Sequence, residues 1–229
     1  MWNLALACAF FVCIHLMISG TDLKAQIISS IGRIAYYALF SVFSIAGLIW
    51  ITGAFVFALN DSTNNVVLWG APLFLRVIAI VINLAAFLLV VVGALSPSPT
   101  HLLSLVKMPQ RPVRGIIRVS RHPVLAGITL WALAHMLCNG NLANWLFFGS
   151  IVAVCVLGAI NIDRKRQAAL GEAYDDIKKR TSIIPFVAII DGRTAFAIEE
   201  IGFARMLLAV SLYSVILVFH EILFNARIF

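Results

Sequence analysis

Long apolar runs separated by short polar segments are the feature that most limits how this chain can fold. Only 12% of the residues are charged, about half of the share in soluble domains. A helix needs roughly 20 apolar residues to cross a hydrocarbon core of about 30 Å. The pattern predicts an all-α protein, a polytopic transmembrane helical bundle with about six crossings: Trp2–Ser19, Ala35–Leu59, Leu73–Leu95, Val124–Leu137, Trp145–Asn161 and Met206–Phe224.

Two polar segments interrupt this pattern, and we expect them to belong to a single transmembrane domain that spans residues 1–229. Residues 96–121 contain four prolines, which forbid a continuous helix and predict a proline-rich loop. Residues 163–204 mix charged and apolar side chains and predict a segment at the membrane surface. Within this segment the charged run Asp163–Arg166 is interpreted as a solvated face.

Lysine and arginine are concentrated in the same two segments, whereas the connections Asn60–Asn65 and Asn139–Asn144 contain neither. The positive-inside rule therefore predicts cytoplasmic basic loops and an N-terminus outside. This bias also explains the formal net charge of +7. We expect membrane lipids as partners and no nucleic acid, and the sequence carries no signal for an oligomeric state.

Two histidines lie inside apolar runs, His15 in the first and His135 in the fourth. An ionisable side chain inside a membrane is costly and is by default a candidate functional residue. Neutral imidazole is a ligand of metal ions and of haem iron. We expect the rings of His15 and His135 to differ in depth within the membrane by on the order of 10–15 Å. This difference suits a haem between the two rings better than one metal ion that both rings bind. The alternative is two unrelated histidines, each hydrogen-bonded to a backbone carbonyl or a hydroxyl.

A second candidate site precedes the fourth apolar run, where Arg118, Arg121 and His122 lead into Pro123. Arginine binds phosphates, carboxylates and haem propionates through charge-assisted hydrogen bonds. Proline suits the first turn of a helix, and the positive end of that helix attracts anions. We therefore expect these three residues to contact an anionic group of a cofactor. Ordinary positive-inside flanking explains the two arginines equally well.

The string from His122 to Ala143, which contains Trp131-Ala132-Leu133-Ala134-His135 and Asn139-Gly140, resembles the NnrU family of bacterial membrane proteins. Ile14-His15-Leu16 and Val67-Leu68-Trp69 extend the resemblance over about the first two-thirds of the chain. It implies a bacterial inner-membrane location and a role in denitrification and nitric-oxide metabolism.

The same family includes relatives of plant 15-cis-zeta-carotene isomerase, a haem b protein. The resemblance therefore implies haem b bound by His15 and His135, and redox or isomerisation chemistry on a lipophilic substrate. The isomerase has a cysteine, implicated in changing iron ligation, where this chain has Ala132. The resemblance thus does not extend to that ligand change, and the catalytic residues stay unknown.

A further similarity leaves other functions open. Gly115-Ile116-Ile117-Arg118, Arg121-His122-Pro123 and Ile184-Pro185-Phe186 resemble isoprenylcysteine carboxyl methyltransferases and phospholipid methyltransferases. This implies S-adenosylmethionine as the alternative cofactor, although Asp163-Arg164-Lys165 stands where those enzymes have an acidic pair. The alternatives are thus a membrane methyltransferase and a non-enzymatic assembly factor for respiratory reductases.

Overall fold

The structure is a computed structural model that describes residues 1–229 apart from 19, 71, 99, 101–112, 227 and 229. Part of the predicted proline-rich loop therefore lies outside the described residues. The longer helices are α1 (Trp2–Cys13), α3 (Arg33–Leu59), α4 (Leu73–Ala94), α6 (Pro123–Cys138), α7 (Leu142–Leu170) and α10 (Phe203–Val218). The shorter ones are the π-helix η1 (Ile14–Ile18), α2 (Leu23–Ile31), α5 (Ile116–Val119), α8 (Glu172–Arg180), α9 (Val187–Ile190), the 3₁₀ turn η2 (Ile198–Glu200) and α11 (His220–Phe224).

The six apolar runs are helical, the first as α1 and η1 and the last as α10 and α11, which confirms the predicted all-helical membrane bundle. Among the described residues, α3, α4 and α7 are long and apolar enough to cross a membrane. The pair made of Trp2–Ile18 and Leu23–Ile31 gives a fourth span if it is counted as one, bent by 79°. α6 and α10 are shorter apolar helices, each about 24 Å long at 1.5 Å per residue. The number of crossings, about six, stays a prediction.

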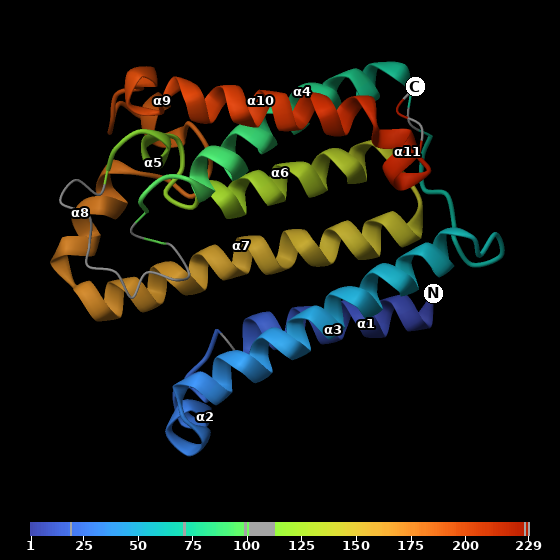
Figure 1. The fold of residues 1–229 in the computed structure, drawn as a ribbon, viewed down its shortest axis with the longest axis horizontal. Helices are drawn as coiled ribbons and strands as arrows, with labels where there is room; N and C mark the ends of the chain where they lie inside the picture. The colour runs from blue at the N-terminus through green and yellow to red at the C-terminus, as the bar shows by residue number, and fades with distance from the viewer. Residues whose placement is uncertain (19, 71, 99, 101–112, 227, 229) are drawn as a thin grey trace.

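The long helices run roughly along one axis and pack as successive neighbours (Figure 1). α10 lies against α4, α4 against α6, α6 against α7, and α1 against both α7 and α3. The close approach of α4 and α6 depends on Gly127. A Cβ atom added there would lie 2.7 Å from the carbonyl oxygen of Ala86 and 2.7 Å from Cγ2 of Val90.

The two ends of the bundle differ in charge. The N-terminus, α11 and the connections after α3 and α6 lie at one end, which we call the terminal end (Figure 1). There the amide of Leu142 donates to the carbonyl oxygen of Val66 at 2.9 Å, and the amide of Leu68 donates to that of Gly140 at 2.6 Å. The opposite end carries α2, α5 and α8 and is called the basic end. The sequence assigns the basic end to the cytoplasm, and this orientation stays a prediction.

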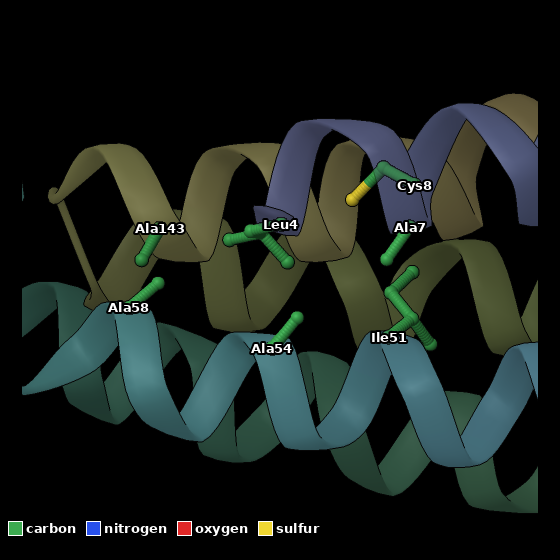
Figure 2. Close-up of a cluster of buried hydrophobic side chains, with 7 residues drawn as sticks. All are labelled: Leu4, Ala7, Cys8, Ile51, Ala54, Ala58 and Ala143. Atoms are coloured by element: carbon green, nitrogen blue, oxygen red, sulfur yellow. The ribbon is translucent and has the colours of Figure 1, made fainter. Parts of the chain in front are cut away.

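A cluster of mostly small side chains joins α1, α3 and α7 near the terminal end (Figure 2). Small residues allow helix backbones to approach closely, as is usual for helix packing in lipid. The Sγ of Cys8 donates to the carbonyl oxygen of Leu146 at 3.4 Å and sets the register of α1 on α7. The cluster consists of Leu4, Ala7, Cys8, Ile51, Ala54, Ala58 and Ala143.

At the basic end α7 continues beyond the predicted end of its apolar run, Asn161, as far as Leu170. The chain then turns at Gly171, whose φ of +55° suits a residue without a Cβ atom, and enters α8. The prediction that the charged run starting at Asp163 is a solvated face was wrong for Asp163 itself, because its side chain is buried. The reason is that neighbouring elements supply polar partners for it.

Candidate functional site

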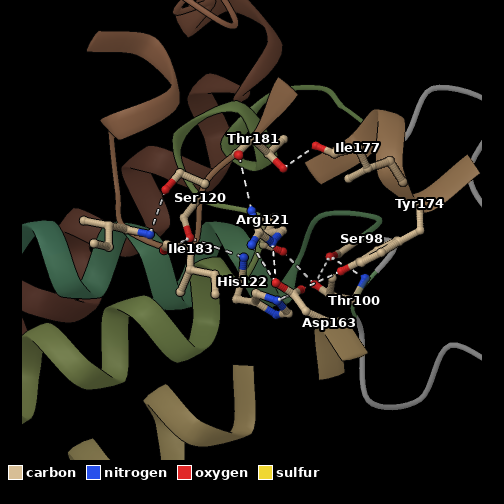
Figure 3. Close-up of polar contacts among 12 residues, drawn as sticks. Ser98, Thr100, Ser120, Arg121, His122, Asp163, Tyr174, Ile177, Thr181 and Ile183 are labelled. Atoms are coloured by element: carbon tan, nitrogen blue, oxygen red, sulfur yellow. Dashed lines mark hydrogen bonds and ion pairs between the residues drawn. The ribbon is translucent and has the colours of Figure 1, made fainter. Parts of the chain in front are cut away.

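Among the described residues, the carboxylate of Asp163 at the basic end is the centre of a buried polar network (Figure 3). Arg121 donates to Oδ2 from Nε at 2.8 Å and from Nη2 at 2.6 Å. Nε2 of His122 and the hydroxyl of Tyr174 donate to Oδ1 at 2.6 Å and 2.7 Å. The structure therefore brings together two of the predicted site residues, Arg121 and His122, through an acid from another helix.

The backbone around Arg121 explains why its side chain reaches Asp163. His122 is the N-cap of α6 and Pro123 occupies the first turn, as predicted. The amide of Arg121 donates to the carbonyl oxygen of Ser182 at 2.9 Å, and its Nη1 donates to that of Thr181 at 3.2 Å. These contacts connect the start of α6 with α7, α8 and the segment after α8. A buried ion pair whose polar atoms are satisfied in this way is typical of a structural connection.

Tyr174 on α8 contributes a neutral donor to this network. Its side chain is fully buried, and burial together with its hydrogen bond to Asp163 raises the pKa of the phenol well above its ordinary value. The phenol therefore keeps its proton at physiological pH. Because a protonated phenol donates and a carboxylate accepts, the Tyr174–Asp163 bond holds α8 against α7.

Arg118 on α5 faces a second carboxylate, that of Glu200. Its Nε and Nη2 donate to Oε2 at 2.8 Å and to Oε1 at 3.1 Å, and its Nη1 donates to the hydroxyl of Thr194 at 3.0 Å. The amide of Gly115 also donates to Oε2, at 2.8 Å. The Arg118 guanidinium and then this amide lower the pKa of Glu200 to about 2. The anionic group beside Arg118 in the structure is thus the chain's own glutamate.

His15 lies on the π-helical turn η1, at the end of α1 that is nearer the basic end. Short π-helical segments occur frequently at functional sites. The ring packs against Phe11 and against Phe40 of α3, with centroid separations of 4.4 Å and 5.6 Å. Its Nδ1 bonds the carbonyl oxygen of Phe11 at 2.8 Å. A carbonyl can only accept, so Nδ1 carries the proton and Nε2 of the neutral ring keeps a lone pair.

His135 lies one turn before the end of α6, near the terminal end. Its Nδ1 donates to the carbonyl oxygen of Trp131 at 2.8 Å, so its Nε2 is also left as the lone-pair nitrogen. The ring packs against Trp131 and against Phe148 of α7, with centroid separations of 4.9 Å and 4.8 Å. Its ring centroid is 6.5 Å from that of His220 on α11. Histidine ligands of metals usually donate their second nitrogen in this way.

The two predicted ligands, His15 and His135, are on different helices at different depths. Cys8 contacts Leu146, so His15 lies well past Leu146 along α7, whereas His135 packs on Phe148. His15 is seven residues after Cys8 and Phe148 is two residues after Leu146, so at 1.5 Å per residue the two rings are offset by about 7–8 Å along the bundle. Two nitrogens on one metal ion are only about 4 Å apart. Among the described residues, no group of three or more His, Cys, Asp and Glu side chains is arranged to hold a metal ion.

A family model described as NnrU protein matches residues 3–228 of the chain. The chain belongs to the NnrU family. The sequence motifs predict this family, and the match confirms it. The match also extends beyond the first two-thirds of the chain.

This NnrU-family protein is also similar to two curated plant proteins. Each is named 15-cis-zeta-carotene isomerase, chloroplastic, one from Zea mays and one from Arabidopsis thaliana, and each is 44% identical over 79 residues. The matched region is 34% of this chain and 22% of the relative. The chain thus spans about a fifth of the length of these relatives. No solved structure matches.

Sequence reasoning missed three residues of the NnrU-family protein that the structure places beside predicted ones. The sequence predicts Asp163 only as part of the charged run with the basic residues that follow it, and it contains no signal for Glu200 or His220. One signal for Asp163 was available: it is the first acid after a long apolar run and leads into a strongly basic segment. Glu200 and His220 are distant in sequence from Arg118 and His135, so only the fold shows that they are neighbours.

Proposed function

We propose that this NnrU-family protein binds haem b within its helical bundle and acts on a lipophilic substrate by isomerisation. The observation that carries the proposal is the hydrogen bonding of the two intramembrane histidines. Both His15 and His135 donate Nδ1–H to a carbonyl oxygen of their own helix. Each ring is therefore oriented by a backbone bond and keeps Nε2 for a metal, the arrangement expected of a histidine ligand.

The residues fit haem better than a small ion because one histidine suffices to hold haem iron, whereas no group of three or more His, Cys, Asp and Glu side chains among the described residues is arranged to hold a metal ion. Aromatic side chains surround both rings: Phe11 and Phe40 beside His15, and Trp131 and Phe148 beside His135. Such surroundings suit an apolar macrocycle and a lipophilic substrate. When bound, the haem would supply an iron centre whose oxidation state can change.

The activity itself is proposed from the relatives. Two of them are named as carotene isomerases, which favours isomerisation of a long apolar molecule delivered from the lipid phase. The association of the family with denitrification makes a role in nitrogen-oxide metabolism the second form of the proposal, with redox chemistry at the same haem. The proposed location is the bacterial inner membrane, with the basic end in the cytoplasm and the N-terminus outside.

The second candidate site, which consists of Arg118, Arg121 and His122, has a smaller role in this proposal. Arg121 and His122 bond Asp163, and Arg118 bonds Glu200. At 1.5 Å per residue, His122 and His135 are about 20 Å apart along α6. Contact of these three residues with propionates stays a prediction. The carboxylate of S-adenosylmethionine would have to compete at this segment with the same two carboxylates, those of Asp163 and Glu200.

The test is the absorption spectrum of the full chain purified in detergent and titrated with haem b. We expect an equimolar complex with a Soret band, and a dissociation constant at least about tenfold weaker in His135→Ala. Thr129→Ala is the matched control, because it removes another side-chain bond to the backbone of α6, that of the Thr129 hydroxyl to Leu125. The control should leave haem binding unchanged.

Other outcomes decide against the proposal. A colourless protein that binds S-adenosylmethionine would identify the methyltransferase alternative. A protein that binds neither cofactor would favour the non-enzymatic assembly role.

A further inference from the structure

Positively charged side chains gather at the basic end where α2, the start of α3 and the end of α7 lie (Figure 1). Lys24 on α2 lies over two tyrosines of α3, with its Nζ 5.7 Å from the ring centroid of Tyr36 and 5.2 Å from that of Tyr37. The guanidinium of Arg33 lies 5.9 Å from the ring centroid of Tyr37. With two residues of α7, these side chains form what we call the cation cluster: Lys24, Arg33, Arg164 and Lys165.

The end of α7 supplies the other two cations of the cluster. Nη2 of Arg164 donates to the carbonyl oxygen of Gly20 at 3.3 Å and to Oδ1 of Asn161 at 3.2 Å, which holds the chain before α2 against α7. The ammonium of Lys165 is close enough to Lys24 and Arg164 to be repelled by their charges. Three helices therefore contribute positive charge to one surface.

The chain itself neutralises little of this charge. Arginines elsewhere at the basic end pair with carboxylates. Among the residues that the structure describes, none of Lys24, Arg33 and Arg164 forms an ion pair. Asp22 acts on Lys165 with the opposite sign, but it is a single acid beside four cations. An exposed surface with this excess of positive charge attracts an anion.

The cation cluster lies at the depth expected for lipid headgroups. The segment Trp2–Ile18 and helix α2 are bent by 79° relative to each other, so a first segment that crosses the membrane leaves α2 close to the membrane plane. Exposed apolar side chains lie beside the cations, among them Leu23 of α2 and Ile34 of α3. Tyrosine, as at Tyr37, is typical of the boundary between headgroups and hydrocarbon. A lipid bound here would place its headgroup on the cations and its acyl chains on apolar side chains.

We propose that the cation cluster binds the headgroup of an anionic phospholipid with two phosphate groups, of the cardiolipin type. Phosphate oxygens accept charge-assisted hydrogen bonds from Lys and Arg, and basic sites between transmembrane helices bind such headgroups. Four cations and one acid suit two phosphates better than one. Helix stability does not explain Lys24 and Arg33, because each is in the first turn of its helix, where positive charge is unfavourable. A bound lipid connects α2 and α3 with the end of α7.

The experiment titrates the full chain in a neutral detergent with cardiolipin and measures bound lipid by native mass spectrometry. We expect one cardiolipin molecule per chain. Each Lys or Arg near anionic lipid changes affinity about fivefold, so the double variant Lys24→Gln with Arg33→Gln should bind roughly 30-fold more weakly. Lys178→Gln with Lys179→Gln is the matched control, because it removes the same charge from α8 at the same end. The control should bind as the unmodified chain does.

Further measurements separate a lipid site from other causes. The charge-conserving exchange Lys24→Arg with Arg33→Lys should retain the lipid, whereas a loss of binding there would show that positive charge is not what binds it. Phosphatidylglycerol should bind more weakly than cardiolipin, and equal affinities would overturn the assignment of two phosphates. Equal weakening in the two glutamine double variants would refute the site, because it would show a general attraction to net charge. Displacement of cardiolipin by inorganic phosphate would overturn the proposal in favour of a soluble anion.

Discussion

Replacement of Asp163 by asparagine tests whether the network at the basic end is a structural connection. The carboxylate accepts two hydrogen bonds from Arg121 and one each from His122 and Tyr174. Asparagine has nearly the same shape but no charge, so it leaves the buried guanidinium of Arg121 without its counter-ion. Breaking a buried ion pair by removing one partner costs about 3–5 kcal/mol. We expect the lower value, about 3 kcal/mol, because the amide oxygen still accepts.

The measurement is thermal unfolding in detergent, read as apparent Tm at one fixed heating rate. For a chain of this length a change of 1 kcal/mol shifts Tm by about 2–4 °C, so Asp163→Asn should lower Tm by about 6–12 °C. Asp176→Asn is the matched control, because it removes an acid that pairs with Arg180 on the exposed surface of α8. Exposed pairs contribute only about 0–1 kcal/mol. Equal Tm shifts in the two variants would refute the structural role of Asp163.

Two further predictions concern other contacts. Arg118 is the main cause that lowers the pKa of Glu200 from its ordinary value of 4.5 to about 2. The ionised Glu200 therefore stabilises the fold at pH values above 4.5, and this stabilisation is lost as the pH falls toward about 2. The Tm difference between the unmodified chain and Glu200→Gln should therefore be constant above about pH 5 and shrink in acid; a difference independent of pH would contradict the ion pair. Gly127→Ala should cost about 1–3 kcal/mol, because the new methyl group meets the backbone of α4. Gly158→Ala is the matched control, because a Cβ atom at that position meets nothing within 4 Å. Its Tm should stay the same or rise slightly, because alanine has the higher helix propensity. An unchanged Tm in Gly127→Ala would show that α4 and α6 can move apart without cost.

The amino-acid sequence predicted the helices well, because each depends on a local property. A long apolar run can satisfy its backbone groups in lipid only as a helix, and all six runs are helical. Pro123 and the turn Asn139–Asn141 set the ends of α6 in the same local way. The bias of Lys and Arg predicted which segments share the basic end.

The sequence by itself therefore determined the helical class, the family and the two histidines that lie inside apolar runs. Only the tertiary structure decided what those histidines and arginines face. Asp163 meets Arg121 across 42 residues of chain, Glu200 meets Arg118 across 82, and His220 approaches His135 from another helix. Such pairings depend on helix register and on the bend at Phe219. Register is set by side-chain packing between helices, which a single sequence with uniform apolar runs does not specify.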